Sequence, residues 1–125
     1  MRIVDVTQWY AATSGGIRTY LHAKADWAER VGIEHAIVVP GPVAGQSTVA
    51  ASQLVSLRGR TLSERWGYRM VVRPRPIVDA LDELEPDIVV THDVMGFPST
   101  LGRWAAARGI PLAMFCHSNA AAAVA

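Results

Sequence analysis

Short, mostly apolar runs alternate along the chain with longer stretches in which apolar residues recur every three or four positions. The short runs are typical of strands that are covered on both faces, and they occupy residues 3–6, 36–39, 54–57, 87–91 and 112–116. The helical spacing occupies residues 17–31, 77–84 and 98–108, and these stretches end at Gly32, at Glu85-Pro86 and at Gly109. Strands that alternate with helices predict an α/β fold with a doubly wound, mostly parallel sheet.

The segments between these elements carry weaker patterns. Pro40-Gly41-Pro42 is expected to end the second strand, because proline cannot donate a hydrogen bond to a sheet. It also stands where many dinucleotide-binding domains place the acidic residue that holds a ribose, which disfavours an NAD site. Residues 43–53 are mostly small or polar and predict a loop, whereas residues 68–72 predict a further short strand.

The first helical stretch contains large and charged residues whose surroundings can be predicted from their spacing. Tyr20 and Trp27 share the spacing of its apolar residues, so both are expected to pack against the sheet. Lys24 breaks this apolar stripe. His22 and His35 are expected at the surface or at an edge of the fold, rather than as ligands of a metal.

The composition predicts one ordered domain, since 50% of the 125 residues are hydrophobic and 18% are charged. The 12 basic and 11 acidic residues give a net charge of +1, which disfavours a dedicated nucleic-acid-binding protein. No apolar run approaches the length of a membrane span, and the first strand leaves no room for a signal peptide. We therefore expect a soluble, cytoplasmic protein, and its single cysteine, Cys116, excludes an internal disulfide.

Basic residues gather between Arg58 and Arg75, where six arginines stand against one acidic residue, Glu64. The simplest interpretation of such a run is a solvated face. The alternative is a patch for an anionic acceptor or for lipid headgroups, which would bring the protein into peripheral contact with the inner face of a membrane.

The connection between the first strand and the first helix ends in Ser14-Gly15-Gly16 and predicts an anion site. The first N–H groups of a helix carry partial positive charge, and glycine lets a phosphate approach the backbone closely. Gly15 and Gly16 would supply this bare backbone, and Arg18 would add a charged donor one turn into the helix. The two standard phosphate-loop fingerprints are absent, so a plain strand-to-helix turn capped by Ser14 is the alternative.

Polar residues follow several of the predicted strands, at the carboxyl edge where doubly wound sheets bind ligands. We expect three pairs to meet along that edge, namely Gly15-Gly16, His92-Asp93 and His117-Ser118. Other chemistry has little support. Cys116 and His117 are neighbours on an extended strand and would point to opposite faces. The four histidines show no zinc-motif spacing, and no G-x-S-x-G elbow is present.

Three motifs follow one another along the chain: G-G-I-R-T-Y-L at 15–21, L-E-P-D-I-V-V-T-H-D at 84–93, and the stretch from Gly109-Ile110-Pro111 to His117-Ser118. In this order they resemble the amino-terminal domain of the family-4 retaining glycosyltransferases. The resemblance implies a GT-B fold, in which two Rossmann-like domains enclose the active site. It also implies an enzyme that moves a sugar from a nucleotide-sugar donor to an acceptor.

The same resemblance implies roles for individual residues. Gly15 and Gly16 would contact the donor diphosphate through their backbone N–H groups, with Arg18 as the neighbouring charged donor. His117 would be the catalytic residue beside the reacting sugar. The acceptor side of the cleft would be lined by His92, Asp93 and Ser118. No metal ion and no cofactor are expected.

Residues 1–119 are expected to form this amino-terminal domain, and residues 120–125 an alanine-rich tail at which the sequence stops. The family's second Rossmann-like domain, which carries most of the donor contacts and an acidic E-x7-E motif, is missing from the chain. We therefore expect this chain to be incomplete and inactive alone. Three other interpretations stay open: a non-catalytic sugar- or nucleotide-binding module, half of a sugar-nucleotide epimerase, and an unrelated nucleotide-binding domain.

Overall fold

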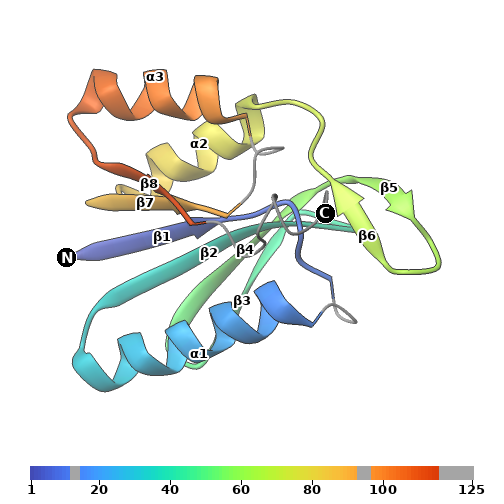
Figure 1. Ribbon diagram of the computed structural model, residues 1–125, viewed down its shortest axis with the longest axis horizontal. Helices are drawn as coiled ribbons and strands as arrows, with labels where there is room; N and C mark the ends of the chain where they lie inside the picture. Colours follow the sequence, from blue (N-terminus) through green and yellow to red (C-terminus); the bar gives the residue numbers. More distant parts are fainter. Residues whose placement is uncertain (12–14, 93–96, 116–125) are drawn as a thin grey trace, which may run out of the picture.

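The computed structural model describes residues 1–11, 15–92 and 97–115 of the chain (Figure 1). The helices are α1 (Gly16–Val31), α2 (Arg75–Leu84) and α3 (Pro98–Arg108). The strands are β1 (Arg2–Val6), β2 (Glu34–Gly41), β3 (Gly45–Val49), β4 (Ser52–Arg58), β5 (Arg60–Ser63), β6 (Tyr68–Met70), β7 (Ile88–Thr91) and β8 (Leu112–Met114). The strands and helices that the hydrophobic pattern predicts are thus present, within a few residues of their expected bounds.

Six of the strands form one sheet in the order β3-β4-β2-β1-β7-β8. Five of them run parallel, and β3 lies antiparallel to β4 at one edge. The chain moves outward from β1 to β2 and β4, and then crosses to the other side of β1 for β7 and β8. This order confirms the predicted doubly wound, mostly parallel α/β sheet.

Helices cover both faces of the sheet, with α2 and α3 on one face and α1 on the other (Figure 1). Successive side chains of a strand point to opposite faces, so β1 and β2 contribute to two separate cores. The larger core, on the side of α2 and α3, includes Val4, Val6, Val38, Leu81 and Leu101. The smaller core, on the side of α1, includes Leu21, Ile37 and Val39.

Strand β2 is longer than predicted, because it runs through Pro40 and ends at Gly41. The carbonyl of Val38 accepts a hydrogen bond from the Thr7 amide, so the backbone groups of Val38 face β1. Two residues further on, Pro40 faces the same side, beyond the last residue of β1 that pairs with β2. The missing N–H of Pro40 therefore leaves no sheet bond unmade, and the strand ends inside Pro40-Gly41-Pro42, at Gly41, rather than before it.

The hydrophobic pattern missed two strands, β3 and β5. Strand β3 lies in the segment 43–53 that was predicted to be a loop, and it pairs with β4. Strand β5 pairs with β6 in a two-stranded hairpin that extends from the carboxyl edge of the main sheet (Figure 1). The predicted strand at 68–72 corresponds to β6. Both missed strands are largely exposed, so neither needs the apolar run by which a buried strand is found.

Three predictions about α1 and its surroundings need correction. Trp27 is 40% exposed and does not pack against the sheet, since smaller side chains such as Ala25 and Ala28 form the buried stripe of α1. Tyr20, in contrast, packs against the smaller core as predicted. His35 is buried in a central strand, not at a surface or edge. The N-cap of α1 is Gly15 rather than Ser14.

Candidate functional site

The carboxyl ends of β1 and β7 mark the place where the strand order of the sheet reverses. The connection after β1 leads to α1 on one face, and the connection after β7 leads to α3 on the other (Figure 1). Doubly wound sheets bind ligands in the crevice left between two such diverging connections. Gly15, Gly16 and His92 lie at this edge, as the sequence predicts. The other predicted site residues, Asp93, His117 and Ser118, lie outside the described residues.

Helix α1 begins at this edge with bare backbone. Its N-cap, Gly15, makes no side-chain hydrogen bond, and its first turn contains no acidic residue. The first intrahelical hydrogen bond runs from the Thr19 amide to the Gly15 carbonyl, at 3.0 Å. The N–H groups that precede Thr19 in the helix therefore have no carbonyl partner within it. Among the described residues, a Cβ atom added to Gly15 or Gly16 would meet no atom within 4 Å beyond its chain neighbours and its own helix. The fold thus leaves open space over an electropositive helix end that suits a phosphate.

Arg18 adds a donor that the fold leaves unused. Among the described side chains, its Nε is the buried nitrogen or oxygen atom without a hydrogen-bond partner. Native proteins satisfy nearly all buried polar atoms, so an orphaned donor beside the helix end is consistent with a ligand that is not part of the chain. Burial lowers the pKa of His22, and the charge of Arg18 lowers it further, against the opposing effect of Asp26. A neutral His22 ring can accept the hydrogen bond of the Tyr10 hydroxyl, 2.8 Å from its Nε2.

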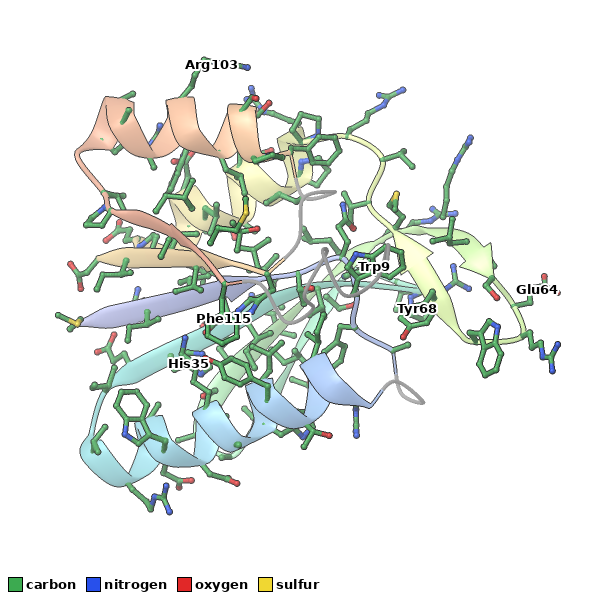
Figure 2. The ribbon with its side chains drawn as sticks, viewed as in Figure 1. Trp9, His35, Glu64, Tyr68, Arg103 and Phe115 are labelled. Atoms are coloured by element: carbon green, nitrogen blue, oxygen red, sulfur yellow. The ribbon has the colours of Figure 1, made fainter. Side chains whose placement is uncertain are left out.

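Gln8 fixes the connection between β1 and α1 to the segment after the hairpin. Its buried side chain donates from Nε2 to the Val71 carbonyl at 2.8 Å and accepts from the Val71 amide at Oε1, at 2.9 Å. Beside this pair, the rings of Trp9 and Tyr68 meet edge to face, with their centroids 5.5 Å apart (Figure 2). The sequence analysis missed Gln8, whose only signal is its place directly after a buried strand.

Asp5 is fully buried and is the centre of a polar network on the α1 side of β1. Its Oδ1 accepts hydrogen bonds from Lys24 Nζ at 3.0 Å and from His92 Nε2 at 2.6 Å. Its Oδ2 accepts from His35 Nε2 at 2.6 Å, and the Nδ1 of the same ring lies 2.7 Å from Ser52 Oγ. Burial by itself would raise the pKa of Asp5, but the two histidine bonds and the charge of Lys24 outweigh it and hold the pKa well below its ordinary value. The network therefore contains a buried carboxylate.

This network fixes the position of His92 at the carboxyl end of β7. A carboxylate can only accept, so the Nε2 of His92 carries the proton of the bond to Asp5. The ring is buried and lies 5.7 Å from the ring of Tyr20 and 6.0 Å from that of Phe115, centroid to centroid. Tyr20 and Phe115 in turn stack at 5.1 Å. The sequence placed His92 at this edge but missed its support, although an acidic residue within an apolar strand was a usable signal.

Two hollows lie beside this edge of the sheet. The Tyr10 hollow, of about 440 Å³, is bounded by the β1–α1 connection, the end of β2 and the hairpin turn, and its lining includes Tyr10. The arginine hollow, of about 430 Å³, lies between the end of β4 and the hairpin, and its lining includes Arg58, Arg60 and Arg69. Pro42 and Arg69 line both hollows, so the two hollows adjoin each other.

The part of the chain that the structure describes contains no group of three or more His, Cys, Asp or Glu side chains arranged to hold a metal ion. None of the described helices has both the length and the apolar character needed to cross a membrane.

Comparison with known proteins gives a family, two curated relatives and a structural neighbour. A family model described as a glycosyl transferase 4-like domain matches residues 15–125. The relatives are GDP-mannose-dependent alpha-(1-6)-phosphatidylinositol dimannoside mannosyltransferases from the H37Ra and CDC 1551 strains of Mycobacterium tuberculosis, each 29% identical over 120 residues. The match covers 95% of this chain and 31% of each relative, so the chain spans about a third of the length of the curated relatives it matches.

The structural neighbour is apo UGT2 of Phytolacca americana, with a TM-score of 0.52 and 15% sequence identity. The superposition covers 96% of this chain and 30% of that one. This likeness concerns the fold alone, and it matches the described sheet and helices to half of a GT-B glycosyltransferase.

Proposed function

Because the chain belongs to the family of glycosyl transferase 4-like domains, we propose that it is the acceptor-side, amino-terminal domain of a hexosyl-transferring enzyme. The donor would be a nucleotide sugar, and a second Rossmann-like domain would complete the cleft. The share of the relatives that the chain spans, 31%, supports a partner domain of this kind. A non-catalytic sugar- or nucleotide-binding module, or half of a sugar-nucleotide epimerase, would share the fold, but the family match favours transfer.

The start of α1 would hold the donor diphosphate. In glycosyl transfer, the bond between the anomeric carbon and the diphosphate breaks, a bond to the acceptor oxygen forms, and the acceptor hydroxyl gives up its proton. Negative charge develops on the departing diphosphate, and fixed N–H donors stabilise such charge without reorganising. Gly15 and Gly16 would supply backbone donors, and Arg18 a positive charge. The observation that carries this assignment is the buried, unpartnered Nε of Arg18 at that helix end.

The polar residues that follow β7 and β8 would serve the acceptor and the reacting sugar. We propose that His92, Asp93 and Ser118 form the acceptor side of the cleft. The ring of His92 is buried, so it would act by positioning the rings of Tyr20 and Phe115 rather than by touching the acceptor.

The arginine-rich segment from Arg58 to Arg75 supports a further part of the proposal, a peripheral contact at the cytoplasmic face of a membrane. Its hairpin exposes Leu62 and Trp66, and the guanidinium of Arg65 lies over the Trp66 ring at 5.1 Å. Exposed apolar side chains among arginines suit the interface of an anionic bilayer. We expect the chain to sediment with vesicles that contain phosphatidylglycerol but not with pure phosphatidylcholine vesicles; equal sedimentation with both would contradict this contact.

Sugar transfer by the complete enzyme tests the proposed function directly. We expect the complete enzyme to form a glycosylated product from a nucleotide sugar, with GDP-mannose first in the panel because the curated relatives are named as GDP-mannose-dependent. Residues 1–125 alone should form no product, because a single rim of the cleft cannot align donor and acceptor or exclude water. Mass spectrometry of the acceptors measures both. Turnover by residues 1–125 alone, or no transfer from any donor by the complete enzyme, would refute the proposal.

His117 is proposed to form a hydrogen bond with the reacting sugar or with the adjoining phosphate. In the complete enzyme, His117→Ala should lower kcat about ten- to a hundredfold, because this is the usual loss when a hydrogen bond to a charged group is removed. Thermal stability should change little. Turnover and melting temperature are measured on the same preparation. Early melting with unchanged specific activity would instead give His117 a purely structural role.

A further inference from the structure

The arginine hollow gathers three positive charges that the fold does not neutralise. Arg58 ends β4, Arg60 begins β5 and Arg69 lies on β6, so the three side chains come from two different sheets. No acidic residue is among the described residues that line the hollow. Glu64, the one acid of the segment, lies at the outer end of the hairpin (Figure 2).

Other arginines of the chain do form ion pairs, which makes the lack of an acidic residue in the lining of the arginine hollow informative. Arg75 pairs with Asp79 at 3.1 Å, and Arg108 pairs with Asp82 at 2.9 Å. Across the described part of the chain, Arg58, Arg60 and Arg69 take part in no ion pair. Like charges brought together in a hollow repel one another and concentrate a positive field, which an incoming anion relieves. A guanidinium group matches the geometry of a phosphate and can donate two parallel hydrogen bonds to two of its oxygens.

The walls of the hollow are fixed by backbone contacts, so the arginines are presented on a prepared surface. The Gly59 amide donates to the Gly41 carbonyl at 2.9 Å, and Arg69 Nη1 donates to the Gly59 carbonyl at 3.1 Å. A Cβ on Gly59 would lie 3.1 Å from backbone atoms of Met70 and from Cβ of Pro40, which is tighter than most Cβ contacts, so this close approach favours glycine. A site that is built before the ligand arrives loses less entropy when it binds.

The position of the hollow connects it with the cleft. Arg69 and Pro42 line both the arginine hollow and the Tyr10 hollow, and the latter reaches the β1–α1 connection. The lining of the Tyr10 hollow also includes the hydroxyl-bearing residues Ser47 and Ser56. Each hollow has the volume of a small-molecule site, so one ligand can place a hydroxylated ring in the first and an anionic group in the second.

We propose that the arginine hollow, formed by Arg58, Arg60 and Arg69, binds the phosphate group of a phosphorylated acceptor whose hydroxylated part occupies the Tyr10 hollow. This inference rests on the proposed function, because it names the class of acceptor that the same cleft receives. The phosphate can belong to a soluble phosphate ester or to the headgroup of a lipid, since both present the same oxygens to the arginines.

Binding of two probes to paired charge variants tests the site. The site variant carries Arg58→Gln and Arg60→Gln, and the control variant carries Arg30→Gln and Arg103→Gln. Each loses two positive charges from exposed positions, but only the first pair lines the hollow, and the control pair lies on α1 and α3, outside the segment that is proposed to contact a membrane. The probes are glycerol 3-phosphate, measured by calorimetry, and phosphatidylcholine vesicles with and without phosphatidylglycerol, measured by sedimentation. Circular dichroism confirms that both variants are folded.

We expect the site variant to bind at least about tenfold more weakly than the unmodified chain, and the control variant to bind within about twofold of it. Saturable binding of glycerol 3-phosphate with this pattern would show that the site binds a soluble phosphate ester. The same pattern with vesicles, but no binding of glycerol 3-phosphate, would show that the site binds the phosphate of a lipid headgroup. Equal losses in both variants, or no binding of either probe, would overturn the proposal. Because no sugar is transferred in these measurements, their failure is distinct from failure of the proposed glycosyltransferase activity.

Discussion

Replacing Asp5 with alanine should reduce the free energy of unfolding by about 3–5 kcal/mol, the usual cost of removing one partner from a buried charged network. The carboxylate is the shared acceptor of Lys24, His35 and His92, and its loss would leave the two histidines without this partner in a buried region and Lys24 without it in a partly buried one. Small domains are stable by only about 5–15 kcal/mol, so this one change removes a large part of the total. Urea denaturation followed by circular dichroism measures the loss.

A matched control comes from an exposed acid of the same type. Asp79 pairs with Arg75 at 3.1 Å on the surface of α2, and its side chain is 54% exposed. Asp79→Ala should therefore change the free energy of unfolding by no more than about 1 kcal/mol. If Asp5→Ala were as mild as Asp79→Ala, the buried network would not be a major source of stability.

The same network makes stability depend on pH in a predictable direction. The folded pKa of Asp5 lies well below its ordinary value, because the bonds from His35 and His92 and the charge of Lys24 outweigh the effect of burial. A carboxyl group of this kind stabilises the fold fully above the unfolded pKa, about 4, and the contribution is lost as the pH falls further. The unmodified chain should therefore lose stability below about pH 4, and Asp5→Asn should show a smaller loss over that range.

The alternation of strands and helices was predictable because burial imposes a clear pattern on these elements. β1, β2 and β7 are covered on both faces, so their apolar runs are nearly unbroken. Gly32 and Gly109 end their helices in the left-handed region, at φ of 75° and 66°, which glycine adopts without strain. Strands β3 and β5 had no such signal, because their own side chains are largely exposed.

The candidate site was only partly predictable, because its polar residues are related through the register of the sheet. Residues such as Gly15, Gly16 and His92 could be placed at one edge from the order of elements alone. The link between Asp5 and His35 depends on β1 lying beside β2 with Ile3 opposite His35, which no local pattern encodes. Lys24 was visible as a break in an apolar stripe, and the structure explains it, since its ammonium group reaches Asp5 at 3.0 Å.

Replacing Gly16 with valine should lower the kcat/KM of the complete enzyme for its nucleotide sugar on the order of a hundredfold or more, the cost of losing a backbone donor to developing charge. The fold itself does not require glycine here. A Cβ at Gly16 would meet no atom of the described residues within 4 Å beyond its neighbours and its own helix, and valine is a better helix former than glycine. The branched side chain would instead occupy the space over the first turn of α1, where the diphosphate is proposed to lie.

Gly102 provides the matched control for this substitution. It lies in α3, on the other face of the sheet, and a Cβ there also meets no atom within 4 Å. Gly16→Val and Gly102→Val should both leave the melting temperature within a few degrees of the unmodified enzyme, whereas only Gly16→Val should impair use of the donor. Initial rates over a range of donor concentrations, with melting curves of the same samples, separate the two effects. Equal rates for all three proteins would show that the backbone at Gly16 does not approach the donor, because a larger side chain at position 16 would then hinder neither folding nor use of the donor.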